Sequence, residues 1–243
     1  MKKTNKILTR ALVILLALVL ITSSVVSSTF AKYVVRKEAK TTVGLEAFGL
    51  KVELSGSGVN GETDKKNGES ITYKVKNITL TPGDETYKNA ITARVYGEAN
   101  VAANVTMDVK VEYGGGEFVV SKNDFSGWTA NKTYVPIAFT VGDSKATDSY
   151  NSLTADEATT AIKDKIKTVY TDFSGGTYKI AKGTKNIDET YNFGFIWEKN
   201  VGTGETQLLF DQVGTYLANQ TTNKSTVTIT YTISVEQDTT ASN

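Results

Sequence analysis

Apolar and polar residues alternate along most of this chain, and the alternation predicts β-strands. The clearest run is Val101 to Tyr113, in which every second residue is aliphatic or aromatic. A second long run, Val227 to Val235, sets apolar residues against a row of threonines and a serine. A period of two places one face of a strand in the core and the other in water, as an antiparallel sheet requires. The same period recurs over residues 50–54, 71–75, 91–95, 137–141 and 191–197.

One segment changes to the period of a helix. Thr154 is followed three residues later by Glu157, the spacing of a capping box. Apolar residues then recur every three or four positions, which predicts a helix from about Ala155 to Tyr170. A weaker pattern of the same kind predicts a second helix over residues 207–217.

Polar and glycine-rich stretches separate the predicted strands and are interpreted as loops. The longest covers residues 55–70, and "YGGGEF", Tyr113 to Phe118, is interpreted as a hairpin turn between two strands. A series of strands with helices in the connections predicts a mainly β fold, an antiparallel β-sandwich with one or two inserted helices. The sequence shows neither an internal repeat nor a linker, so a single domain is expected.

The N-terminus has the three parts of a secretory signal peptide. Four basic residues precede an apolar stretch, residues 11–26, and small residues follow it. Thr29 and Ala31 fit the −3 and −1 positions of a cleavage site, so residues 1–31 are predicted to be removed and Lys32 to begin the mature chain. A retained membrane anchor is the alternative, but the most apolar part, Ala11 to Ile21, is shorter than the ~20 residues needed to span a bilayer.

Composition narrows the possible functions. Hydrophobic residues make up 40% of the 243 residues, enough for a core, and the chain contains no cysteine and no histidine. Disulfides, thiolate metal sites and the commonest catalytic base are therefore excluded. Loss of the signal segment removes four basic residues and leaves 23 basic and 26 acidic ones, a formal charge of −3. This balance does not favour nucleic-acid binding.

Few residues suggest chemistry. Glu62, Asp64 and Glu69 carry oxygen ligands suited to calcium, but their spacing does not match an EF-hand and a solvated hairpin loop is favoured. The acidic residues Asp156 and Glu157 suit the start of the predicted helix. The aromatic run over residues 191–197 is interpreted as core rather than as a ligand groove. We expect no catalytic residue, no resident metal and no cofactor.

Several stretches together resemble the TasA/camelysin family of secreted fibre proteins from Gram-positive biofilms. The segment "SSTFAKYVV", Ser27 to Val35, looks like the family's cleavage site for a dedicated signal peptidase. Residues 77–114 look like its Leu-x-Pro-Gly-Asp turn followed by two strands. The segment "ADEATTAIKDKIK" lies where the family has a helix, and "STVTITYTISVEQ" looks like its last strand.

The resemblance implies a jelly-roll sandwich that is secreted to the cell surface or biofilm matrix and assembles with itself into fibres. In such fibres, each subunit donates its N-terminal segment as a strand to the next subunit. Here the resemblance places the donated strand at about residues 32–36, with Tyr33, Val34 and Val35 as its apolar part. The charged run Arg36 to Lys40 would then suit a solvated connector. Other matrix proteins and the signal peptidase are the further partners implied, and membrane contact is expected only through the uncleaved signal segment.

Two other functions remain open at the level of sequence. The first is a monomeric adhesion or binding module at the cell surface. The second is the metallopeptidase activity described for some camelysin relatives. A catalytic zinc site without histidine or cysteine would need carboxylates alone, which is atypical, so we do not expect this chain to be an enzyme.

Overall fold

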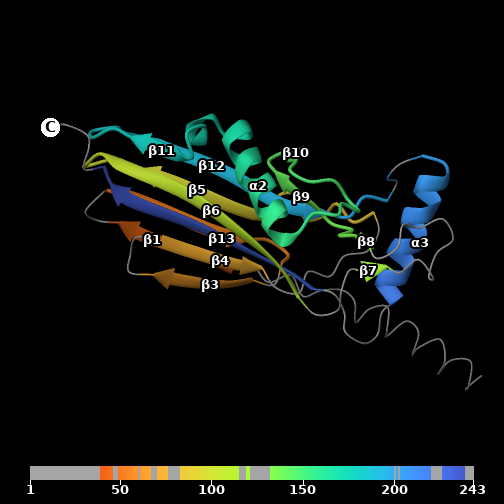
Figure 1. Cartoon of the computed structure of the whole chain (residues 1–243). Helices are drawn as coiled ribbons and strands as arrows, with labels where there is room; N and C mark the ends of the chain where they lie inside the picture. The colour runs from red at the N-terminus through yellow and green to blue at the C-terminus, as the bar shows by residue number, and fades with distance from the viewer. Residues whose placement is uncertain are drawn as a thin grey trace, which may run out of the picture. The chain divides into compact units, whose positions relative to one another are not determined.

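The fold is a sandwich of two antiparallel sheets (Figure 1). The computed structural model describes residues 39–45, 49–59, 61–66, 70–75, 83–114, 119–120, 132–199, 201, 203–219 and 226–238. All of them belong to one compact unit, Lys37–Asn243. The predicted class, mainly β with helices inserted in connections, is confirmed.

The first sheet has six strands and the second has five. In spatial order the first contains β1 (Ala39–Leu45), β2 (Leu50–Gly56), β5 (Ile91–Gly97), β12 (Ile187–Ile196), β9 (Ala138–Val141) and β10 (Ser144–Lys145). The second contains β11 (Thr177–Ile180), β6 (Ala103–Gly114), β13 (Thr226–Gln237), β4 (Ser70–Val75) and β3 (Gly61–Lys66). A separate ribbon pairs β7 (Val119–Val120) with β8 (Lys132–Thr133). Along the chain, successive strands pass repeatedly from one sheet to the other.

The apolar faces predicted from the period of two form the core between the sheets. In β13, every second residue from Val227 to Val235 is buried, and β4 and β5 show the same alternation. Phe193 of β12 meets Tyr231 of β13 across the core, with ring centroids 5.1 Å apart. The long β6–β13 pairing runs from Ala103↔Gln237 to Gly114↔Thr226, so these two strands form the centre of the five-stranded sheet.

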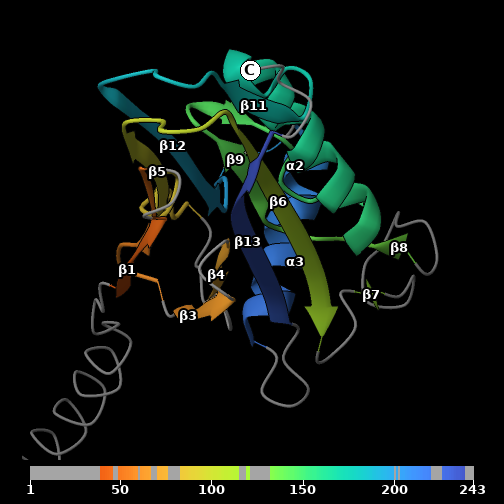
Figure 2. The same cartoon turned by 90° about the vertical axis from the view of Figure 1, so that its left-hand side faces the viewer.

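Helix α2 (Ala155–Val169) closes one side of the sandwich (Figure 2). Its capping box is formed as predicted: the Glu157 N–H donates to the Thr154 hydroxyl, and the Glu157 side chain accepts from the Thr154 N–H. Its buried residues Ala158, Ile162 and Ile166 face the opening between β6 and β9. The short 3₁₀ helix η1 (Thr171–Phe173) follows it.

Helix α3 (Glu205–Asn219) confirms the second, weaker helix prediction. It packs on an aromatic cluster: Phe210 stacks on Tyr150 with centroids 4.8 Å apart, and the Trp197 indole N–H donates to the Tyr150 hydroxyl at 2.8 Å. Tyr150 has a φ of 57°, unusual for a bulky residue. Gly214 lies against this cluster, where a Cβ would stand 2.5 Å from the Tyr150 hydroxyl.

Three loop predictions are wrong. The predicted loop over residues 55–70 contains β3, which pairs with β4 from Gly61↔Val75 to Lys66↔Ser70. An edge strand tolerates the charged sequence "GETDKK", so its polarity did not signal a loop. The segment "YGGGEF" is not a hairpin turn, because β7 pairs with β8 and not with β6. The predicted connector Arg36 to Lys40 ends inside a strand, since Ala39 and Lys40 belong to β1.

Candidate functional site

The two long sides of the sandwich are closed in different ways (Figure 2). On one side, the short edge strands β10 and β11 are accompanied by α2, whose Thr159 hydroxyl accepts the backbone N–H of Val111 in β6 at 2.9 Å. On the other side, the edge strands β1 and β3 approach each other, and no described helix covers them. The β1–β3 side is therefore the candidate site for pairing with another chain.

Strand β1 pairs with β2 over its whole length, from Ala39↔Gly56 to Leu45↔Leu50. No described strand lies beyond it in the sheet. An edge strand of this kind presents a row of backbone N–H and C=O groups to an incoming strand. This edge can therefore accept a strand by hydrogen bonding.

The residues predicted to be processed or donated all lie outside the described residues. They are Thr29, Ala31 and Lys32 at the cleavage site and Tyr33, Val34 and Val35 in the donor strand. The predicted donor segment ends at Arg36, and only Lys37 and Glu38 separate it from β1. In the sequence, the segment thus leads directly into an edge strand.

Tyr73 lies at the seam between the two sheets on this side. Its side chain is fully buried, and its ring occupies space left by two glycines: a Cβ on Gly56 or on Gly61 would stand 2.1 or 2.2 Å from its phenol atoms. The Tyr73 hydroxyl has no hydrogen-bond partner among the described residues. Burial raises the pKa of Tyr73 above its ordinary value, so the hydroxyl stays protonated at neutral pH.

A network of charged residues covers part of the outer face of the six-stranded sheet. Arg94 forms two hydrogen bonds to Asp188, at 2.6 and 2.8 Å, and its guanidinium lies 4.5 Å from the ring centroid of Tyr96. The Tyr96 hydroxyl donates to Glu53 at 2.9 Å. The hydrogen bond from Arg94 lowers the pKa of Asp188. These contacts link β2, β5 and β12.

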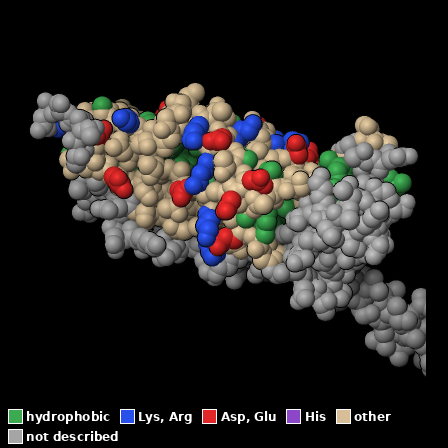
Figure 3. Space-filling view, viewed as in Figure 1, with side chains coloured by type: hydrophobic (Ala, Val, Ile, Leu, Met, Phe, Trp, Pro, Cys, Tyr) green, Lys and Arg blue, Asp and Glu red, His purple; other side chains and the backbone are tan. Residues whose placement is uncertain are grey.

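Charges of both signs are also mixed on the face seen in Figure 3. Lys110 contacts Glu112 at 2.9 Å, and Lys163 contacts Asp108 at 2.6 Å. Because basic side chains alternate with acidic ones, the described part of this face does not form a basic surface that would bind a polyanion.

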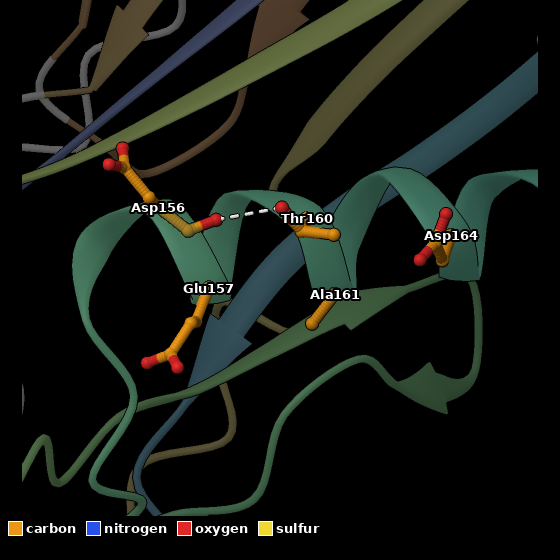
Figure 4. A pocket seen from close by; sticks show the side chains of 5 residues that line it. All are labelled: Asp156, Glu157, Thr160, Ala161 and Asp164. Atoms are coloured by element: carbon orange, nitrogen blue, oxygen red, sulfur yellow. Dashed lines mark hydrogen bonds between the residues drawn. The ribbon is translucent and has the colours of Figure 1, made fainter.

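A shallow depression along α2 is lined by Asp156, Glu157, Thr160, Ala161 and Asp164 (Figure 4). Hydrogen bonds from the Thr154 backbone N–H and hydroxyl lower the pKa of Glu157, and Asp164 pairs with Lys167 at 3.0 Å. The Glu157 and Asp164 carboxylates are therefore engaged in contacts with residues of the helix and its cap. The described residues contain no cluster of three or more side chains placed to hold a metal ion.

The remaining predicted candidates are not brought together. Glu62 and Asp64 belong to β3, and Glu69 lies outside the described residues, so the solvated loop predicted around them is partly a strand. Tyr191, Phe193, Phe195 and Trp197 are buried, which confirms their interpretation as core. Within the described ranges, no helix is long and apolar enough to cross a membrane.

Sequence analysis placed Tyr73 in the core but missed its unpartnered hydroxyl. The two glycines that accommodate its ring come from different strands, and no local pattern connects them to Tyr73. The available signal was the presence of glycine at the end of one strand and at the start of the next, positions where small residues permit close approach. Comparison of the chain with family models, curated proteins and solved structures found no match, so the resemblance to the TasA/camelysin family stays a prediction.

Proposed function

We propose that this protein is a secreted structural protein of the cell surface or biofilm matrix that assembles into fibres. Each subunit donates its N-terminal segment, residues 32–36, to the sheet of the next subunit. The observation that carries the proposal is the position of β1: it is an edge strand, and the predicted donor segment ends two residues before it in the chain.

The physical basis is backbone pairing at a sheet edge. A donated strand satisfies the free N–H and C=O groups of an edge, and its alternate side chains enter the acceptor. Head-to-tail donation does not close on itself, so it propagates as a filament. Burial of Tyr33 and Val35 would contribute roughly 1.5–3 kcal/mol each.

Signal cleavage controls the process in this account. While residues 1–31 remain attached, the donor segment is held next to the apolar signal sequence. Cleavage after Ala31 frees Lys32 and makes the strand available to a second subunit. We assign the chain no catalytic role, because it has neither histidine nor cysteine and no familiar nucleophile motif.

The test is the assembly of the mature chain beginning at Lys32. Negative-stain microscopy and sedimentation velocity should show fibres for the wild type and monomers for Tyr33→Asp/Val35→Asp, because each aspartate would place a charge in a dry groove. The matched control is Lys179→Asp/Lys182→Asp, which introduces the same acids at exposed positions in and just after β11, away from the donor segment and from β1, and should still form fibres. A wild-type protein that stays monomeric under all conditions would favour the adhesion-module function instead.

A further inference from the structure

The four edge strands in the described part of the two sheets differ in how well they could accept another strand. β10 has only two residues and β11 has four. β3 has six, but four of these are charged, and charged side chains on an edge oppose pairing with another chain. β1 has seven residues, of which only Lys40 is charged. β1 is therefore the edge that is long enough for a five-residue segment and least protected against it.

The hydrogen bonds at the two ends of β2 show which residues of β2 bond toward β1. The Gly49 C=O accepts from the Glu98 N–H, and the Ser57 N–H donates to the Ala90 C=O. Both bonds continue the pairing of β2 with β5 beyond its ends. Because successive residues of a strand in an antiparallel sheet bond to opposite sides, the even-numbered residues of β2 bond toward β1.

This alternation also identifies the backbone groups of β1 that face outward. Leu50 and Gly56 of β2 have Leu45 and Ala39 of β1 as register partners, so these two residues of β1 bond toward β2. The residues that alternate with them direct their N–H and C=O groups to the free side of the sheet. These residues are Lys40, Thr42 and Gly44.

The segment that precedes β1 is poorly placed to pair with the edge of its own β1. Only Lys37 and Glu38 separate residues 32–36 from β1. An antiparallel return over two residues requires a type I′ or II′ turn, whose positive φ angles favour Asn, Asp and Gly over Lys and Glu. A parallel return requires a crossover of a dozen or more residues. A second copy of the chain is therefore the source of a segment that reaches this edge.

The direction of pairing decides whether assembly stops or continues. Because the donor segment and β1 follow each other in the chain, antiparallel pairing would place the donor segment of each copy beside β1 of the other. This reciprocal exchange has two-fold symmetry and closes as a dimer. Parallel pairing leaves one β1 edge and one donor segment free at the two ends of the pair, so further copies can add.

We infer that residues 32–36 of one copy pair in parallel with Lys40–Gly44 in β1 of the next copy, with Val34 beside Thr42. The outward N–H and C=O of Thr42 then bond to the main chain of the incoming segment. This inference rests on the proposed fibre function and adds the acceptor strand, the register and the direction of pairing.

The register follows from the two faces of the sheet. Thr41 and Val43 of β1 are the register partners of Leu54 and Val52, which are buried in the core. Residues beside each other on neighbouring strands share a face of the sheet. With Val34 beside Thr42, the two remaining apolar residues of the segment lie on the core face of the sheet, next to Thr41 and Val43. They are Tyr33 and Val35.

Cross-linking in assembled fibres tests the strand and the direction. The chain has no cysteine, so introduced cysteines can be linked selectively. Mature Lys40→Cys protein is mixed with either Lys32→Cys or Arg36→Cys protein, assembled, and treated with a short thiol cross-linker. The two donor variants are matched, because each replaces one basic residue at one end of the segment. We expect a 32–40 product by mass spectrometry and no 36–40 product above the level seen with unassembled protein.

The other outcomes separate this inference from the proposed function. Fibres that give the 36–40 product would show antiparallel pairing, and fibres that give neither product would show a different acceptor. Either result overturns the inference and leaves fibre formation intact. If the wild type forms no fibres, the proposed function and the inference fail together.

The role of the β1 backbone is tested with Thr42→Pro and the matched control Thr42→Ala. Proline removes the outward N–H of residue 42 and leaves the hydrogen bonds between β1 and β2 in place, whereas alanine keeps this N–H. Both variants should keep the circular dichroism of the wild type. Thr42→Pro should raise the critical concentration for assembly about tenfold or more, and Thr42→Ala should change it less than about twofold. Equal critical concentrations for the two variants would contradict pairing at this edge.

Discussion

At the scale of single residues, a few side chains stabilise the beginning of α2. Thr154 and Glu157 satisfy each other's backbone N–H groups in the capping box. The bonds from Thr154 lower the pKa of Glu157, so the folded protein favours the carboxylate form. Both effects depend on groups at the protein surface and can be changed without disturbing the core.

Replacing Thr154 by alanine should lower the free energy of unfolding by about 1 kcal/mol, because the helix loses its N-cap acceptor. Urea denaturation at neutral pH measures the change. Thr160→Ala is the control, because Thr160 is exposed in the same helix and should change stability by less than about 0.5 kcal/mol. Equal effects for the two variants would show that the capping box does not stabilise α2.

The stabilisation by Glu157 should depend on pH. Because its folded-state pKa is below the ordinary value of 4.5, its contribution is present above that pH and is lost as the pH falls through the folded-state pKa. Wild type should therefore exceed Glu157→Gln in stability at neutral pH, and the difference should shrink as the pH falls below 4.5 and through the folded-state pKa. A difference that stays constant over this range in urea titrations would contradict the assigned cause.

At the scale of elements, the hydrophobic pattern predicted the strands and helices that are determined mainly by their own sequence. Strands β6 and β13 are long and alternate regularly, and α2 has both its cap and its apolar face in one continuous segment. Strand β3 has a charged sequence and forms because β4 offers it an edge, so its existence depends on a partner and not on its own pattern.

The candidate site was less predictable than the elements that form it. Sequence analysis predicted a donor segment next to the cleavage site, but it did not identify the part of the fold that would pair with this segment. The seam at Tyr73 requires Gly56 from one sheet and Gly61 from the other to meet the same phenol ring. Such a meeting follows from strand order and register, which alternation within a single strand does not determine.

The packing of α3 can be tested at Gly214. In an exposed helix, Gly→Ala stabilises by up to about 1 kcal/mol. Here the new Cβ would lie 2.5 Å from the Tyr150 hydroxyl, which is held by Trp197 and stacked on Phe210. The cost of overpacking should exceed this gain, so Gly214→Ala should lower the free energy of unfolding by about 1–2 kcal/mol. Thermal unfolding measures the stability of Gly214→Ala, and Thr215→Ala, a substitution at an exposed neighbouring residue, is the control. If Gly214→Ala stabilises the protein, α3 is loosely packed against the aromatic cluster.

At the scale of the whole molecule, the proposed function links secretion and assembly through one cleavage. The −3 and −1 residues Thr29 and Ala31 predict that the mature chain begins at Lys32. Mass spectrometry of the culture supernatant should detect this N-terminus. If the intact chain is recovered from the membrane fraction alone, the result would support a retained anchor and would contradict the proposed fibre function.

The most direct test of the account removes residues Lys32–Arg36 from the mature chain. The core strands β6 and β13 lie far from this segment in sequence and keep their partners, so the truncated protein should fold with unchanged circular dichroism. Sedimentation velocity and negative-stain microscopy, at the same concentration as wild type, should then show a monomer that forms no fibres. If the truncated protein forms fibres as readily as wild type, the N-terminal segment is not the donor and strand donation is contradicted.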